Sequence, residues 1–420
     1  MARFRTLTEW LDWQMTLNPA EIELGLTRVA RVRDQLPQPG YKPIIITIAG
    51  TNGKGSTVAL LQSIYLAAGF TVGCYTSPHL LRYNERISLN GKPASDEAIM
   101  QAFEQIDQAR GELPLTFFEY GTLAAMVCSL QAKVEVILLE VGLGGRLDAV
   151  NIFEPDVAVV TSVGIDHTDW LGDTREAIGR EKAGIFRRGK PAICADPNPP
   201  QSIFKSVPEV DVDVLGQAYH LEEREGDWSW WNDHESYSSL PLPALVGAEQ
   251  LLNAAAVLQV ISYLQTRLAV LPVHLEAGLQ QASLEGRYQQ ISRECTVVLD
   301  VAHNAQATQA LAKKLTLEAA DFDQTIAVVG VMADKAVADL LDPLLSEVDV
   351  WYCVQPKIER AMEQNAITAV LHEKGQTVIE CASNVGQALE SVLSQVGVED
   401  RVLIFGSFFT VAESLSYLHQ

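Results

Sequence analysis

The sequence predicts an α/β protein with two domains, each built on a mainly parallel sheet that is covered by helices. Three observations predict this class: short β-branched runs alternate with helix-length segments, the alternation restarts after residue 288, and 420 residues exceed the length of one average domain. We expect a first domain over residues 1–288, with a β-rich insertion at about 196–243, and a smaller second domain over residues 289–420.

Five apolar runs in the first domain have the length and composition of buried parallel strands. They lie at residues 44–48, 71–75, 134–139, 157–161 and 191–194. Helical segments are expected at 57–68 and 247–264. The insertion contains three tryptophans, Trp228, Trp230 and Trp231, which we interpret as packing residues rather than as a ligand cage. The strand-like runs of the second domain lie at residues 296–301, 326–331, 348–354, 377–380 and 402–405.

The composition argues against several function classes. Lysine and arginine number 31 against 53 acidic residues, and the resulting net charge of −22 disfavours a sequence-independent grip on nucleic acid or an anionic membrane. We find neither a long uncharged apolar run nor a secretory signal pattern. The six cysteines form no C-x-x-C pair and are interpreted as buried free thiols. We therefore expect a cytoplasmic protein whose partners are small molecules. We also expect it to be a monomer.

A glycine-rich run at residues 49–56 joins the first strand to the first helix. Glycines let backbone N–H groups converge on phosphate oxygens, the helix start adds positive potential, and Lys54 supplies a mobile charge. The strict G-x-x-x-x-G-K-[ST] spacing is not met, because Ile48 occupies the first glycine position and Gly55 follows the lysine. A tight turn without a ligand would explain the glycines but not Lys54. The run predicts a nucleoside triphosphate site.

Polar residues follow two further strands of the first domain. Glu140 ends an apolar strand and precedes a glycine-rich turn that includes Arg146, a position from which a carboxylate can hold magnesium. His167 follows the next strand, and Asp166 and Asp169 flank it as the outer carboxylates of a metal-bound imidazole would. A solvent-facing acid and a structural histidine are the alternative interpretations. We expect a metal site at this edge of the sheet.

Lys182 lies among apolar residues, where burial would lower its pKa and make the neutral amine accessible. Such a lysine could form a carbamate or contact phosphate, and a surface lysine with a buried stem is the alternative. In the second domain, Asp300, His303 and Asn304 follow a strand, as does the turn at 406–410. This turn could bind a carboxylate through N–H groups and a hydroxyl. The alternative for the aspartate and histidine is helix capping.

Taken in order, these motifs resemble those of the bacterial folylpolyglutamate synthase/dihydrofolate synthase family, within the Mur ligase-like group. The resemblance covers nearly the whole chain and is most specific at residues 115–119 and 166–172. It implies an N-terminal P-loop domain and a smaller Rossmann-like C-terminal domain. The motifs that support it lie at residues 50–56, 76–80, 83–86, 115–119, 140–151, 166–172, 181–186 and 300–304.

The resemblance implies a role for individual residues. ATP would be bound by Thr51, Asn52, Gly53, Lys54, Asn253, Arg287 and Asp300. Mg²⁺ would be bound by Ser77, Glu140 and His167. The pterin would be bound by Ile22, Glu23, Leu24, Thr116, Phe117, Phe118, Glu119, Leu147, Asp148 and Ala149. The incoming glutamate would meet His303 and Ser407, and the residues expected to act in catalysis are Lys54, Lys182, which matches a carbamylated lysine, and His303.

The reaction that the resemblance implies is a two-step ligation. A carboxylate of 7,8-dihydropteroate, or of the glutamate tail of a reduced folate, attacks the γ-phosphorus of ATP and forms an acyl phosphate. The amine of L-glutamate then displaces phosphate and forms the amide. Three alternatives stay open: a folylpolyglutamate synthase without the first activity, a cell-wall Mur ligase, and a regulatory P-loop NTPase.

Overall fold

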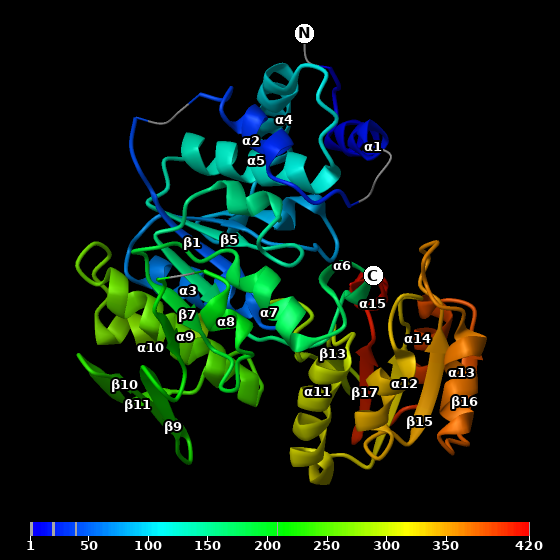
Figure 1. Cartoon of the computed structure of the whole chain (residues 1–420). Helices are drawn as coiled ribbons and strands as arrows, with labels where there is room; N and C mark the ends of the chain where they lie inside the picture. Colours follow the sequence, from blue (N-terminus) through cyan, green and yellow to red (C-terminus); the bar gives the residue numbers. More distant parts are fainter. Residues whose placement is uncertain (1–2, 19–21, 38–39, 208, 420) are drawn as a thin grey trace. The chain divides into compact units, whose positions relative to one another are not determined.

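The computed structural model describes residues 3–18, 22–37, 40–207 and 209–419, which form two compact units (Figure 1). The first unit contains Met1–Ala244 and Glu249–Ser283, and the second contains Leu245–Ala248 and Leu284–Gln420. Each unit has its own sheet. The functional domains at 1–288 and 289–420 stay a prediction.

The first unit contains an eight-stranded sheet in the order β4-β3-β2-β5-β1-β6-β7-β8. Strands β2, β5, β1, β6, β7 and β8 run parallel, whereas β3 and β4 are antiparallel additions at one edge. The strands are β1 (Ile44–Ala49), β2 (Val72–Tyr75), β3 (Ile87–Leu89), β4 (Lys92–Pro93), β5 (Val136–Glu140), β6 (Val157–Val160), β7 (Ala192–Cys194) and β8 (Val212–Val214).

The register of the central strands determines where polar residues meet. Ile48 pairs with Glu140 of β5, and Ala49 pairs with Val160 of β6. Because the carboxyl ends of parallel strands lie at one edge of a sheet, the glycine-rich run, Glu140 and the segment at 161–167 lie at the same edge. The five strands expected from the sequence are all present, with bounds that differ by at most two residues.

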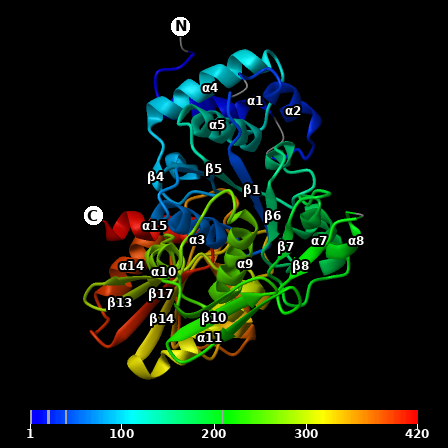
Figure 2. The same ribbon diagram turned by 90° about the vertical axis from the view of Figure 1, so that its left-hand side faces the viewer.

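Helices cover both faces of this sheet. Helices α1, α2, α4 and α5 lie on one side, and α3, α9 and α10 lie on the other (Figures 1 and 2). Trp10 of α1, Phe103 of α4 and Tyr120 of α5 pack against one another between helices of the first group. The helices are α1 (Leu7–Leu17), α2 (Thr27–Arg33), α3 (Lys54–Ala67), α4 (Asp96–Arg110), α5 (Phe117–Gln131), α6 (Thr168–Leu171), α7 (Arg175–Ala183), α8 (Ser202–Lys205), α9 (Ala248–Leu264) and α10 (Pro272–Gln281), with short 3-10 helices η1 (Tyr83–Arg86) and η2 (Ala149–Ile152).

The segment at 196–243 forms a small antiparallel sheet in the order β11-β10-β9 (Figure 1). Its strands are β9 (Tyr219–Glu223), β10 (Asp227–Asn232) and β11 (Ser236–Pro241). The same segment also contains α8 and supplies β8 to the large sheet. Trp228 and Trp230 are fully buried, as expected for packing residues, whereas Trp231 is 37% exposed and stacks on His220.

The second unit contains a six-stranded sheet in the order β12-β13-β17-β14-β15-β16, in which β12 alone is antiparallel. Its core includes Val298, Leu403 and Trp351. The strands are β12 (Gln289–Ser292), β13 (Thr296–Leu299), β14 (Gln324–Val329), β15 (Val350–Val354), β16 (Ile379–Ala382) and β17 (Asp400–Phe405). The helices are α11 (Ala305–Leu317), α12 (Val337–Leu341), α13 (Gln364–Glu373), α14 (Val385–Leu393) and α15 (Phe408–Leu418), with 3-10 helices η3 (Ala319–Asp321) and η4 (Asp342–Leu344).

Membrane-spanning helices and cysteines were both considered in the sequence, and the structure bears on both features. Across the described ranges, no helix combines the length and the apolar character that crossing a bilayer requires. All six cysteines lie in described residues and are free thiols, and five are buried. The expectation of burial is wrong for Cys381, which is exposed on the edge strand β16.

Candidate active site

The glycine-rich loop of the first unit is tied to the segment that follows β6. The backbone N–H of Thr51 donates to the carbonyl of Ser162 (2.8 Å), and that of Asn52 donates to the hydroxyl of Ser162 (3.0 Å). A Cβ at Gly50 would lie 1.8 Å from the hydroxyl oxygen of Thr161, so only glycine fits at this close approach. The loop is therefore held in shape by the neighbouring strand.

Helix α3 begins inside this loop, three residues earlier than the sequence suggested. Its N-cap is Gly53, which has a φ of 86° and supplies no side-chain cap. An uncapped helix start leaves backbone N–H groups and positive potential for an anion. The Nζ of Lys54 donates to the carbonyls of Gly50 (3.0 Å) and Thr51 (3.1 Å), and Asn253 of α9 packs against Gly53. These features fit a bound phosphate chain.

Two of the three expected metal ligands lie in contact. Glu140 is 5% exposed, and its Oε2 accepts a hydrogen bond from the backbone N–H of Ser77 (3.1 Å). The solvent-facing alternative for Glu140 is therefore wrong. A carboxylate and a serine hydroxyl are both oxygen donors, which suit a hard divalent cation. Within the described ranges, no cluster of three or more His, Cys, Asp or Glu residues suits a metal ion, and the expected set contains only two residues of these types.

His167, the third expected ligand, is the N-cap residue of α6 and has a φ of 50°. Its backbone N–H donates to Oδ1 of Asp166 (2.8 Å), and its Nε2 lies 4.0 Å from Oδ2 of the same residue. The imidazole is 43% exposed, so it is accessible to a ligand. Asp169 is exposed on α6. Of the two flanking carboxylates, Asp166 is the one for which the structure records contacts with His167.

Lys182 lies on α7 and is 4% exposed, so the alternative of a surface lysine is wrong. Burial, together with the charge of Lys54, lowers the pKa of Lys182 from 10.5 to about 7, and Asp166 and Asp148 oppose this shift. A large fraction of the amine is therefore neutral near pH 7. These four residues lie close enough for their charges to interact.

Asp148 is 3% exposed and accepts hydrogen bonds from the backbone N–H groups of Leu143 (2.8 Å) and Val150 (3.0 Å). Burial raises the pKa of Asp148 to about 6, while these hydrogen bonds and the charge of Lys54 act in the opposite direction. Asp148 thus links the turn after β5 to the phosphate-binding loop. Arg146 of the same turn is half-exposed and forms an ion pair with Glu181 (2.9 Å).

The structure brings the three expected pterin-binding segments together in the first unit. The backbone N–H of Gly25 donates to the carbonyl of Leu147 (3.3 Å), which joins the first segment to the third. Phe118, in the second segment, packs against Gly142 and lies 5.6 Å from Tyr75, measured between ring centroids. Ile22, Leu24, Phe117, Phe118 and Leu147 are partly buried, whereas Thr116, Asp148 and Ala149 are buried.

Thr116 and Glu119 form a capping box at the start of α5. The backbone N–H of Thr116 donates to Oε2 of Glu119 (2.8 Å), and that of Glu119 donates to the hydroxyl of Thr116 (3.2 Å). Glu119 is 3% exposed and also accepts two hydrogen bonds from Arg28. Burial raises the pKa of Glu119, and the bonds from Thr116 and Arg28 oppose the shift. The carboxylate of Glu119 therefore already organises the helix start.

Three expected residues of the second unit lie close to one another, and two of them contact the ring of Phe408. The guanidinium of Arg287 lies 5.2 Å from the ring centre of Phe408, and the ring of His303 lies 6.0 Å from it. Nδ1 of His303 is 2.9 Å from the carbonyl of Val301. Burial raises the pKa of Asp300, and the charge of Arg287 opposes the shift. These contacts place Arg287, Asp300 and His303 in one neighbourhood.

Other polar groups of this unit are used in the fold. The Asp300 carboxylate accepts from the backbone N–H groups of Tyr288 (2.8 Å) and Ala302 (2.8 Å). Ser407 is the N-cap of α15, and its hydroxyl accepts from the N–H of Thr410 (3.1 Å). Asn304 caps α11 in the same way, so the helix-capping alternative, which was made for Asp300 and His303, is wrong for both residues.

Sequence reasoning missed three side chains that support these sites. Arg28 contacts Glu119 from α2, and Phe408 contacts Arg287 and His303. Arg175 donates to the carbonyl of Val163 (2.8 Å) and to Asp196 (2.8 Å), which in turn accepts from the N–H of Val163 (3.0 Å). This clamp holds the segment before His167. A lone arginine has no local signal, whereas Phe408 lies in the turn at 406–410 that the sequence had indicated.

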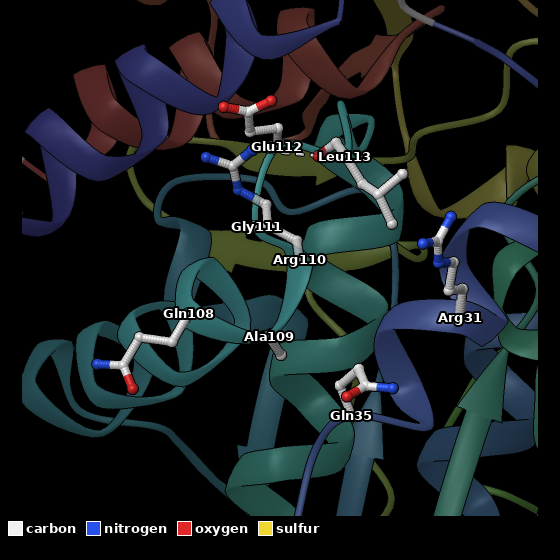
Figure 3. Close-up of a pocket in the computed structure, with 8 residues that line it drawn as sticks. All are labelled: Arg31, Gln35, Gln108, Ala109, Arg110, Gly111, Glu112 and Leu113. Atoms are coloured by element: carbon white, nitrogen blue, oxygen red, sulfur yellow. Dashed lines mark hydrogen bonds between the residues drawn. The ribbon is translucent and has the colours of Figure 1, made fainter.

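A separate hollow of about 630 Å³ lies beside the ends of α2 and α4 (Figure 3). None of the expected site residues lines it. Arg110, at its wall, is held by Asp107 (2.7 Å) and lies over the ring of Trp13 (5.0 Å). We assign no function to this hollow. Its lining residues are Arg31, Gln35, Gln108, Ala109, Arg110, Gly111, Glu112 and Leu113.

Residues 48–260 match the Mur ligase middle domain, and residues 286–408 match the Mur ligase glutamate ligase domain. The chain is 40% identical over 414 residues to dihydrofolate synthase/folylpolyglutamate synthase of Escherichia coli, covering 98% of this chain and 95% of that protein.

Two solved structures are similar over almost the whole chain. E. coli FolC in complex with DHPP and ADP matches with a TM-score of 0.93 and 39% identity, covering 99% of this chain and 98% of that one. Bifunctional folylpolyglutamate synthase/dihydrofolate synthase of Yersinia pestis, complexed with AMPPNP and Mn, matches with a TM-score of 0.90 and 41% identity, covering 99% and 98%.

Proposed function

The chain belongs to the dihydrofolate synthase/folylpolyglutamate synthase family of Mur ligases, and from this premise we propose how its own residues perform the reaction. The protein is an ATP-dependent ligase that joins L-glutamate to dihydropteroate, which forms dihydrofolate, and to the glutamate tail of folates. ATP and a divalent metal serve this activity.

One observation supports the assignment of residues above all others. Asp148, in an expected pterin-binding segment, interacts electrostatically with Lys54 of the phosphate-binding loop. The buried Lys182 is within reach of both charges. A pterin acid bound at Asp148 would therefore present its carboxylate on the side of the first unit that holds the phosphates. This is the arrangement that carboxylate activation requires.

In the first step, a carboxylate oxygen of the acceptor forms a bond to the γ-phosphorus, the bond from that phosphorus to the bridging oxygen breaks, and ADP leaves. Lys54 and the N–H groups at the start of α3 neutralise charge on the transferred phosphoryl group. Thr51, Asn52 and Gly53 shape this loop, and Asn253 packs against it. Ser77, Glu140 and His167 would hold the metal. When bound, the metal supplies further positive charge to the phosphates.

In the second step, the amine of L-glutamate attacks the acyl carbon, a C–N bond forms, phosphate leaves, and the amine loses a proton. We assign Arg287 and Asp300 to the nucleotide, and His303 and Ser407 to the glutamate. The proximity of Arg287 and His303 to Phe408 supports one shared neighbourhood for these residues. The functional domains of the proposal are residues 1–288 and 289–420.

Lys182 is assigned as a carbamylated residue. Its neutral amine can attack carbon dioxide, after which a proton passes to water and the carbamate anion remains. The pKa of about 7, which burial produces, supports this chemistry because much of the amine is neutral at physiological pH. The product would replace a buried neutral amine with an anion beside Lys54.

We further assign the protein to the cytoplasm as a monomer that binds neither nucleic acid nor membranes. The net charge of −22 supports the absence of a polyanionic partner, because like charges repel. The partners are then 7,8-dihydropteroate, reduced folates and L-glutamate.

A purified-enzyme assay with ATP, Mg²⁺ and L-glutamate tests the function. Dihydropteroate and tetrahydrofolate are compared as acceptors by the mass of their products, and we expect a glutamate adduct from both. An adduct from tetrahydrofolate alone would indicate a monofunctional folylpolyglutamate synthase. ATP hydrolysis without either adduct would indicate a regulatory NTPase. With ¹⁸O in the acceptor carboxylate, we expect one labelled oxygen in the released phosphate.

A further inference from the structure

We propose that Arg28 is a positioning residue for the pterin substrate, because it holds the segment at 22–24 against the start of α5. This inference rests on the proposed function. It assigns no direct contact between the arginine and the substrate. Two substrate-binding segments keep their positions relative to each other through one guanidinium.

Arg28 lies on α2 and reaches both segments at once. Its Nε donates to Oε2 of Glu119 (3.0 Å), and one terminal nitrogen donates to Oε1 of Glu119 (2.9 Å). The other terminal nitrogen lies 2.5 Å from Oε1 of Glu23. The guanidinium therefore holds both carboxylate oxygens of Glu119, and it contacts Glu23 at one carboxylate oxygen and at the backbone carbonyl (3.4 Å). Residues 28 and 119 are 91 positions apart in the chain.

The carboxylates of Glu119 and Glu23 differ in their exposure to solvent. Their ion pairs with Arg28 are therefore expected to differ in how much they stabilise the fold. The side chain of Glu119 is 3% exposed and that of Arg28 is 17% exposed, so their pair lies largely out of water. Glu23 is 49% exposed, and a solvated ion pair adds little to stability. The ion pair of Arg28 with Glu23 therefore acts mainly on the position of the loop at residues 22–25. Glu23 also accepts a hydrogen bond from Nδ2 of Asn18 (2.8 Å), which donates to the carbonyl of Pro114 as well (3.1 Å).

The same loop also contacts the third expected segment. Gly25, between Glu23 and Arg28, donates to the carbonyl of Leu147 (3.3 Å). A displacement of residues 22–25 would therefore disturb the neighbourhood of Asp148 as well. The three segments come from distant parts of the chain, and Arg28 contacts two of them directly.

The shape of the side chain matters for this role. An arginine presents donors in a planar fork, so it can hold both oxygens of Glu119 and still reach Glu23. A lysine has the same charge but no fork, so it can satisfy one carboxylate well at a time. The Arg28→Lys variant keeps a cation near the buried carboxylate of Glu119, but it can no longer hold Glu119 and Glu23 at the same time. It is therefore a sharper test than removal of the charge.

The experiment compares Arg28→Lys and Arg28→Gln with wild-type enzyme, and Arg31→Gln on the same helix is the matched control. Arg31 is exposed and lies outside the assigned site. The KM values for dihydropteroate, ATP and L-glutamate are measured, with calorimetric binding of dihydropteroate as a second readout. For both Arg28 variants we expect KM and Kd for dihydropteroate to rise by roughly tenfold. The KM values for ATP and glutamate should stay within about twofold, as should every constant of the control.

Three outcomes decide the matter. If Arg28→Lys binds dihydropteroate within about twofold of wild type, or if all three KM values rise together, Arg28 has no positioning role. If Arg28→Gln fails to fold, Arg28→Lys decides alone. A wild-type enzyme that forms no dihydrofolate would contradict the proposed function itself. That result differs from an active wild-type enzyme whose Arg28 variants have unchanged constants, which would contradict only the role of Arg28.

Discussion

The hydroxyl of Thr51 exchanges two hydrogen bonds with the backbone of Gly164. It accepts from the N–H of Gly164 (2.9 Å) and donates to its carbonyl (3.1 Å). This pair joins the phosphate-binding loop to the segment that ends at His167, and so links the assigned nucleotide site to an assigned metal ligand.

The Thr51→Val variant tests this link. Valine keeps the shape but loses the hydroxyl, so the partly buried N–H and carbonyl of Gly164 lose their partner at a cost of about 1–3 kcal/mol. We expect a higher Mg²⁺ concentration for half-maximal rate than in wild type. Thr51→Ser, which restores the hydroxyl, is the control. An unchanged Mg²⁺ requirement in Thr51→Val would show that the two segments act independently.

The Lys54→Ala variant should lose glutamate-dependent phosphate release almost entirely. The Nζ of Lys54 holds two carbonyls of the loop and is the assigned counter-charge of the transferred phosphoryl group. We expect a loss of at least about a hundredfold in kcat, measured by phosphate release. The exposed Lys92→Ala is a matched control. Turnover near that of wild type would remove the assignment of the phosphate-binding loop.

Glu140→Ala and His167→Ala should change the dependence of the rate on divalent metal. Glu140 is buried beside Ser77, and its loss removes the anionic ligand of the assigned set. We expect both variants to need more Mg²⁺ for half-maximal rate, with the larger effect for Glu140→Ala. Asp169→Ala, at an exposed position near His167, is the control. Rates with an unaltered Mg²⁺ dependence would contradict the metal assignment.

Lys182 should make stability depend on pH. Burial and Lys54 lower its pKa from 10.5 to about 7, so between these values the unfolded chain binds a proton that the folded chain does not. The free energy of unfolding therefore rises with pH from about pH 7 to about pH 10 through this group. Urea unfolding of wild type and Lys182→Met in CO₂-free buffer, at pH 7 and pH 9, measures the effect.

We expect the difference in unfolding free energy, wild type minus Lys182→Met, to be larger at pH 9 than at pH 7. The variant lacks the amine whose protonation destabilises the folded state. The contributions of the other titrating groups are present in both proteins and cancel in the difference. An equal difference at both pH values would show that Lys182 keeps its ordinary pKa.

Glu119→Ala should impair the use of dihydropteroate more than that of a reduced folate. The change removes the partner of Arg28 and one half of the capping box. A folate has its glutamate tail as an additional point of attachment, whereas dihydropteroate depends more on its pterin. The ratio of kcat/KM for the two acceptors measures the effect, and thermal unfolding controls for the loss of the cap. Equal losses on both acceptors would contradict a pterin-specific role.

Local sequence was sufficient for the strands that build the site. The runs at 44–48 and 157–161 were predicted with bounds that differ by one residue from β1 and β6, because β-branched residues next to a polar or glycine turn form a local signal. The start of α3 was predicted at 57 instead of 54, because its cap is the positive φ of Gly53 and not a side chain.

The sequence predicted the burial of individual side chains less well than it predicted the strands. Lys182 was compatible with both a surface and a buried position, since an apolar neighbourhood in sequence does not say which elements pack over it. The structure buries it at α7, near Lys54 and Asp148. Cys381 shows the opposite error, because β16 forms the edge of its sheet.

The sequence by itself determined the chemical class of this protein: a phosphate-binding loop at a strand end, a carboxylate at the end of a later strand, and motifs in the order of a glutamate ligase. Only the tertiary structure decided which polar groups are already engaged, such as the hydroxyl of Thr51 with Gly164 and the carboxylate of Glu119 with Arg28. The physical reason is that these bonds join residues 113 and 91 positions apart. Strand order and helix packing create such contacts, and no local preference of the chain encodes them.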